Sequence, residues 1–153
     1  MDPEIQELST ALESLKKRAR AAVERLGDEG VTWSPGIPDT NSAAQLLTHM
    51  LGAESGTIHA SLGGLTVNRN RDEEFSKPLS TAKDLMALID RIDKTSRSVL
   101  ESETAQTIGR QVATRQPGVT RSARDAIVGV LTHQSEHMGH IELTEQLWNA
   151  QKK

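Results

Sequence analysis

Three of the five histidines lie in one short run near the end of the sequence, at positions 133, 137 and 140. His133 and His137 are four residues apart, so on a helix their imidazole rings leave the same face one turn apart. Two rings in that arrangement can bind one metal ion. The run therefore predicts a metal site, and the competing interpretation is histidines at a solvent edge or with hydrogen-bonded partners in a core.

An ideal helical wheel separates the three rings. His137 falls inside the apolar stripe of its helix, whereas His133 and His140 fall at the edge of that stripe. This border position favours an open site, which leaves a coordination position for water or substrate, over a closed site with four protein ligands. His140 is either a third or alternative ligand, or a residue that hydrogen-bonds to the ligands and orients them.

A third ligand must come from another helix, and only His49 and His59 remain. We expect His59 to be a surface residue. His49 lies midway along a predicted helix, on a flank of small residues that faces away from the apolar stripe of that helix. A bend at Gly52, or a cavity in place of a packed seam, would be needed to bring His49 to a metal ion, so spacing alone does not make it a ligand.

Glu54 is the other unusual residue, because it lies on the apolar face of the same helix between Leu51 and Ile58. A carboxylate in such a place must be paired or protonated. We expect it to be the buried partner of an arginine or a histidine. The functional alternative is a general base or an additional metal ligand, which makes Glu54 the one candidate catalytic residue in the sequence.

Two groups of arginines could serve a substrate. Arg69 and Arg71 lie in a charged connector and are candidate substrate-binding residues for an anion, but such a run is also typical of a solvated loop with salt bridges of little energetic value. The same two interpretations apply to the arginines at positions 110, 115 and 121.

Four amphipathic helices are predicted to position these side chains, because apolar residues recur at three- and four-residue steps. We expect them over about residues 3–26, 42–62, 81–103 and 122–148. Residues 104–120 are either a short strand-like piece or irregular chain. With no convincing strand signal elsewhere, the pattern predicts an all-α four-helix bundle that forms a single domain over residues 1–153.

Composition excludes several classes of protein. The formal net charge is −3 and there are only three aromatic residues, which argues against nucleic acid as a partner. Cysteine is absent, so the chain has no thiolate ligand or nucleophile of its own. Its apolar runs are too short to cross a membrane, and its first residues are acidic and polar. We therefore expect no membrane partner and a cytoplasmic location.

Taken together, these motifs resemble the DinB-like superfamily of metal-dependent bundles, which also includes thiol-dependent S-transferases and mycothiol-dependent maleylpyruvate isomerases. Members carry one histidine midway along the second helix and His-x-x-x-His on the fourth, followed by a small residue, Gln or His, and an aliphatic residue. Here the matching segments are Trp33-Ser-Pro-Gly, the run from Asn41 to His49, and His133 through Ile141. The run from Asn70 to Phe75 is similar to a motif in one uncharacterised branch.

The resemblance covers about residues 5–148 and implies a bundle that commonly forms a homodimer. It implies His49, His133 and His137 as ligands of one divalent metal ion, zinc or nickel, and leaves His140 as an orienting residue. The metal would activate water or an external low-molecular-weight thiol against a small-molecule electrophile, as in an S-transferase or a hydrolase. The alternative hypothesis is a non-catalytic bundle that binds a small ligand or a protein partner.

Overall fold

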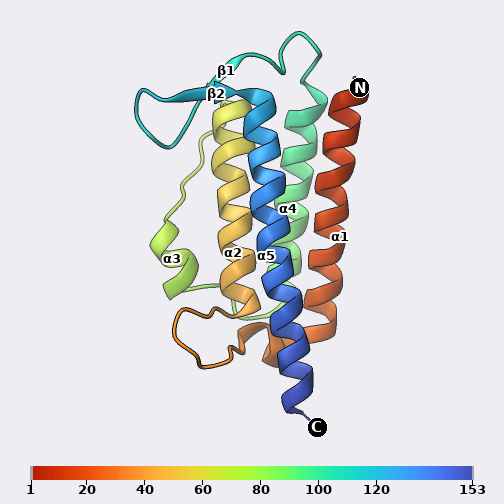
Figure 1. Cartoon of the computed structure of the whole chain (residues 1–153), viewed down its shortest axis with the longest axis vertical. Coiled ribbons are helices and arrows are strands. Elements are labelled where there is room, and N and C mark those ends of the chain that lie inside the picture. The colour runs from red at the N-terminus through yellow and green to blue at the C-terminus, as the bar shows by residue number, and fades with distance from the viewer. Residues whose placement is uncertain (1, 153) are drawn as a thin grey trace.

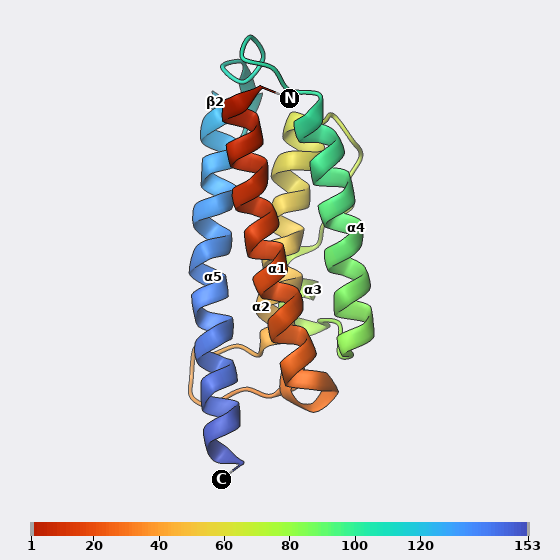
Figure 2. The ribbon, with the colours of Figure 1, turned by 90° about the vertical axis from the view of Figure 1, so that its right-hand side faces the viewer.

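Four long helices run side by side in the computed structural model, which describes residues 2–152 (Figures 1 and 2). They are α1 (Pro3–Thr32), α2 (Ala43–Glu54) with its π-helical continuation η1 (Ser55–Leu62), α4 (Ala82–Glu101) and α5 (Ala123–Gln151). The short helix α3 (Arg71–Ser76) lies between η1 and α4. An antiparallel pair of short strands, β1 (Gln111–Ala113) and β2 (Thr120–Ser122), precedes α5. The predicted all-α four-helix bundle is confirmed.

Side-chain caps explain where the long helices begin. Asp2 accepts from the backbone N–H of Glu4 before Pro3. Thr81 and Ser122 cap α4 and α5 in the same way, each accepting from the N–H three residues on. Ser42 and Gln45 form a reciprocal capping box at the start of α2. Each cap satisfies a backbone donor that has no partner inside its helix, so these starts could be read from the sequence to within a residue or two.

Two glycines adopt left-handed backbone conformations, one inside α1 and one just after η1. Gly27 has a φ of 62° and interrupts α1 near the predicted end, although helical turns resume and continue to Thr32. Gly64 has a φ of 65° and follows the end of η1. Both backbone conformations lie in the left-handed region that favours glycine.

A buried polar layer divides the hydrophobic core into two clusters. On one side lies a cluster that contains Leu51 and Met138, and on the other a cluster that contains Ile58 and Ile127. Between them the fully buried Lys16 of α1 pairs with the fully buried Glu54 of α2. The charges are therefore placed in the interior, where an isolated ion would be very costly.

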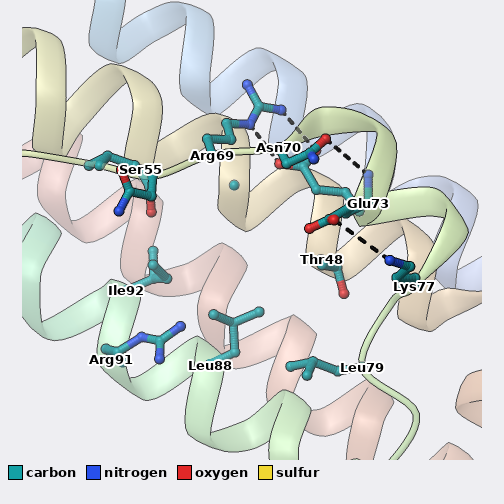
Figure 3. A pocket seen from close by; sticks show the side chains of 14 residues that line it. Thr48, Ser55, Arg69, Asn70, Glu73, Lys77, Leu79, Leu88, Arg91 and Ile92 are labelled. Atoms are coloured by element: carbon teal, nitrogen blue, oxygen red, sulfur yellow. Dashed lines mark hydrogen bonds and ion pairs between the residues drawn. The ribbon is translucent and has the colours of Figure 1, made fainter.

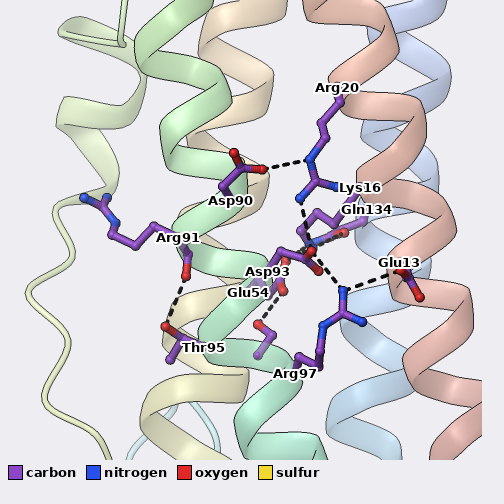
Figure 4. Close-up of polar contacts among 11 residues, drawn as sticks. Glu13, Lys16, Arg20, Glu54, Asp90, Arg91, Asp93, Thr95, Arg97 and Gln134 are labelled. Atoms are coloured by element: carbon purple, nitrogen blue, oxygen red, sulfur yellow. Dashed lines mark hydrogen bonds and ion pairs between the residues drawn. The ribbon is translucent and has the colours of Figure 1, made fainter.

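Every helix of the bundle contributes to this layer (Figure 4). Gln134 of α5 donates its amide to Glu54 and accepts from Lys16 at 3.3 Å. Ser96 of α4 donates to the second oxygen of Glu54 at 2.5 Å, and His59 of η1 lies 2.9 Å from the Ser96 hydroxyl. The expectation of an arginine or histidine partner for Glu54 is thus corrected, because its charged partner is Lys16.

His59 is buried, and the prediction that it lies at the surface was wrong. In η1 the backbone bonds span five residues, as from the N–H of Gly63 to the carbonyl of Ile58 at 2.9 Å. The wider turn holds more residues, so successive side chains diverge by a smaller angle than on an α-helix. Ile58 and His59 therefore both face the interior.

The connector between η1 and α4 packs along the outer flank of α2, and α3 lies beside that helix in Figure 1. A Cβ atom on Gly52 would lie 2.1 Å from Oε1 of Glu74, so only glycine leaves room for the Glu74 carboxylate there. Gly52 and Gly56 thus allow this connector to approach the helix closely. The flank that carries His49 is thus covered rather than exposed.

Trp33 and Trp148 meet at the end of the bundle opposite the strand pair. Their ring centroids are 5.7 Å apart, and Trp148 also packs against Gly30. No helix in the described part of the chain is both long enough and apolar enough to cross a membrane.

Candidate metal centre

The Nε2 atoms of His49, His133 and His137 point toward one another. His133 Nε2 is 3.2 Å from His49 Nε2 and 3.0 Å from His137 Nε2. Each ring offers a nitrogen such that the three lie within 4.8 Å of one another. The helices place them there because α2 and α5 are neighbours in the bundle. In addition, the one-turn spacing of His133 and His137 aligns their rings on one face of α5.

This spacing suits three ligands of one ion. Two nitrogens at 2.0–2.1 Å from a tetrahedral zinc ion are about 3.3 Å apart, close to the 3.0 and 3.2 Å found here. The donor set also fits, because imidazole nitrogens suit zinc, copper, iron and nickel. Glu54 and His140 do not belong to this group of converging ligand atoms.

His49 is held by a carboxylate on α3. Its Nδ1 lies 2.9 Å from Oε2 of Glu74, and since an ionised carboxylate only accepts, Nδ1 carries the proton. The Nε2 lone pair of His49 is then free to face the other histidines. Arg69 donates two hydrogen bonds to the same carboxylate, at 2.6 and 3.0 Å, which balances its charge. Glu74 thus has the orienting role that the sequence suggested for His140.

Burial favours the neutral form of His133 and His137. It lowers the pKa of His133, with a smaller lowering from the neighbouring His49. It also lowers the pKa of His137 to about 4, reinforced by the proximity of His133 and His49. Neutral imidazoles are the form that binds a metal. The Nδ1 atom of His137 is buried without a hydrogen-bond partner in the described chain.

The remaining candidates lie elsewhere. His140 is exposed, and its ring centroid is 6.0 Å from that of His137. In the described part of the chain, no hydrogen bond joins these two rings. Both oxygens of Glu54 are engaged in the buried polar layer. Arg110 bonds to Glu103 and to the carbonyl of Leu62. The structure therefore does not bring these three residues to the histidine cluster.

A cavity of about 330 Å³ opens on the histidines. His49 and His133 line it, together with Arg69, Arg71, Arg115 and Arg121. Arg71 is exposed and lies with its guanidinium carbon 5.4 Å from the Phe75 ring centroid, and that ring packs against His49. The site therefore has room for a small molecule beside the candidate ligands.

A larger cavity of about 650 Å³ lies between α2, α4 and the connector, lined by residues such as Thr48, Asn68 and Leu88 (Figure 3). Arg69 and Glu74 line it too, and Arg69 is shared with the smaller cavity. None of the three clustered histidines lines the larger cavity. The smaller one is thus the better candidate for chemistry at the cluster.

Two residues that the sequence analysis does not identify, Glu74 and Lys16, have a signal in the sequence. Glu74 follows Asn70, which caps α3 ahead of an acidic first turn, and this is the usual pattern of a helix start. Lys16 lies between Leu12 and Ala19 on the apolar stripe of α1, so a buried cation could have been expected. Neither signal names the partner, since that depends on which elements pack together.

The sequence matches a family described as proteins of unknown function, DUF1572, over residues 3–152. The chain belongs to the DUF1572 family. No curated protein matches the sequence.

Solved structures of other proteins share the fold of this DUF1572 chain. A DinB-like protein from Bacillus cereus has a TM-score of 0.73 at 15% identity, with 91% of each chain covered. A DinB-like protein from Bacillus subtilis has a TM-score of 0.72 at 16% identity, covering 94% of this chain and 92% of that one. A conserved protein from Enterococcus faecalis has a TM-score of 0.76 at 14% identity, covering 96% and 97%. The fold that the DinB-like resemblance implies is therefore confirmed.

Proposed function

We propose that this protein is a metal-dependent enzyme in which His49, His133 and His137 bind one divalent ion, zinc or nickel. The observation that carries the proposal is the convergence of three imidazole nitrogens beside a cavity, with Nε2 of His133 3.2 Å from that of His49 and 3.0 Å from that of His137. Three protein ligands and an adjoining cavity are typical of catalytic rather than structural zinc sites.

The ion would act as a Lewis acid that activates a water or a low-molecular-weight thiol. The activated group would then be transferred to a small electrophile. The thiol must be external, because the chain has no cysteine. The protein's own residues hold the site: Glu74 fixes the tautomer of His49, and Arg69 fixes Glu74. Burial favours the unprotonated form of His133 and His137, so both can donate a lone pair at neutral pH.

Elemental analysis of purified, dialysed protein tests the metal centre. We expect about one ion per chain, and loss of that ion in His137→Ala because only two ligands remain. Glu74→Gln should weaken metal affinity about 10–100-fold, the usual effect of removing a residue that orients a ligand. His140→Ala is the matched control, since it removes an exposed histidine from the same helix and should retain the metal.

Full metal retention in His137→Ala would contradict the proposed ligand set. Turnover of a thiol with a panel of small electrophiles, with and without metal, then tests the enzymatic part. Metal-dependent product formation supports it. A stoichiometric metal with no turnover on any substrate would favour the non-catalytic bundle instead.

We also propose a homodimer, as the DinB-like resemblance implies. Light scattering of the purified protein at micromolar concentration should give twice the mass of one chain. A mass equal to one chain across that range would exclude a stable dimer.

A further inference from the structure

The cavity beside the histidines is strongly cationic, although the whole chain has a formal charge of −3. Its lining includes four arginines, and no aspartate or glutamate of the described residues lines it. Positive charge is therefore concentrated at this cavity, although the net charge of the protein is negative. Guanidinium groups gathered without a counter-charge repel one another unless an anion joins them.

The four arginines come from separate parts of the fold. Arg69 and Arg71 belong to the connector and the first turn of α3, Arg115 to the loop between the strands, and Arg121 to β2. Convergence of distant segments is not explained by a local run of charge in the sequence. The strand pair and the connector, which lie outside the four long helices, thus both supply cations to the cavity.

Only Arg69 has a carboxylate partner, Glu74. Arg71, Arg115 and Arg121 form no ion pair within residues 2–152, and the Nε–H of Arg121 is buried without an acceptor there. An unsatisfied buried donor is costly, so a native structure that retains one calls for an explanation. An anionic ligand would supply the missing negative charge.

Arg121 is also close to the candidate metal ligands. A Cβ atom on Gly129 would lie 3.0 Å from Nη1 of Arg121, so this guanidinium rests on α5 one turn before His133. Glycine at that position lets the cation approach the helix. The guanidinium and the histidine then line the same cavity.

We propose that the cavity binds the anionic group, a carboxylate or a phosphate, of a small substrate, and that Arg71, Arg115 and Arg121 recognise it. Planar guanidinium groups match the oxygen pairs of both anions. A volume of about 330 Å³ suits a small molecule and not a polymer. The proposal deepens the proposed function and rests on it, because the bound group would place the rest of the substrate beside the histidines.

Calorimetric titration of protein that has been incubated with zinc and dialysed tests the site, with inorganic phosphate and separately with acetate as the titrant, at 0.15 M chloride. We expect saturable binding of at least one anion, and the tighter one identifies the group. Arg121→Gln should weaken that binding at least tenfold. The double variant R71Q/R115Q should do the same, and since both side chains are exposed it should not disturb folding.

Arg124→Gln is the matched control, because it removes the same charge three residues from Arg121. Its side chain pairs with Glu4 on α1 and does not line the cavity. It should change anion affinity less than twofold. Equal weakening in Arg124→Gln and Arg121→Gln, or no binding of either anion, would overturn the proposal.

Metal content measured on the same samples separates the two hypotheses. A protein that holds its metal but binds neither anion refutes the anion site and leaves the metal centre intact. A protein that lacks metal yet binds phosphate in an Arg121-dependent way refutes the metal centre and supports the anion site.

Discussion

His59 is buried in the protein interior, close to the charged side chains of Glu54 and Lys16. Burial lowers its pKa, while Glu54 raises it and Lys16 lowers it to smaller extents. In the unfolded chain a histidine has a pKa of about 6.5. Below that pH the unfolded state therefore binds a proton that the folded state resists, and the free energy of unfolding falls as pH falls.

We expect His59→Gln to lose less stability between pH 6.5 and pH 5 than the parent protein does. Glutamine can still bond to Ser96 but does not titrate. Urea unfolding of the two metal-free proteins at several pH values measures their free energies of unfolding. The difference between the two proteins at each pH cancels the contributions of the other histidines. Parallel pH profiles for the two proteins would show that His59 does not resist protonation in the folded state.

At the same scale, the part of the site that could be predicted was the part that depends on spacing within one helix. His133 and His137 share a face whatever surrounds them. The roles of Glu74 and Lys16 could not be predicted, because each depends on a partner 25 or 38 residues away along the chain. His49 could be selected only through resemblance, since its own helix places it off the apolar stripe.

Among the elements, the long helices follow from periodicity and from caps such as Ser42 and Thr81. The widened turn of η1 does not, because nothing local distinguishes it from an α-helix with two weakening glycines. Helix α3 and the strand pair are too short to show a clear period. Their stability comes from packing on α2 and α5, which a linear pattern does not contain.

The fully buried ion pair between Lys16 and Glu54 joins α1 to α2. We expect Lys16→Met or Glu54→Gln to lower the free energy of unfolding by about 3–5 kcal/mol, because either leaves one buried charge uncompensated. The double variant K16M/E54Q should cost less than either single change. Urea denaturation followed by circular dichroism measures all three.

Arg18→Gln provides the comparison. It breaks the exposed pair with Glu142 only two residues further along α1 and should cost less than about 1 kcal/mol. Single variants of the buried pair that cost no more than Arg18→Gln would show that the interior charges are not a constraint on the bundle.

For the whole molecule, a metal ion would join the middle of α2 to the middle of α5. Binding to the folded state alone stabilises by about 2.7 kcal/mol at a metal concentration one hundred times the Kd. For a chain of this size that corresponds to a rise of roughly 5–10 °C in Tm.

Thermal unfolding with and without zinc or nickel should show this rise in the parent protein. His133→Ala should abolish it, because only two of the three proposed ligands remain. The same rise in His133→Ala would mean that the ion binds elsewhere on the molecule.

The tryptophan pair gives the protein an optical reporter at one end only. With no tyrosine in the chain, Trp33 and Trp148 account for its intrinsic fluorescence, and both lie where α1 and α5 come together. Their emission therefore follows the closing of that end of the bundle, whereas far-ultraviolet dichroism follows helices along its whole length. Coincidence of the two signals during denaturation would demonstrate that the two core clusters on either side of the polar layer melt as one cooperative unit.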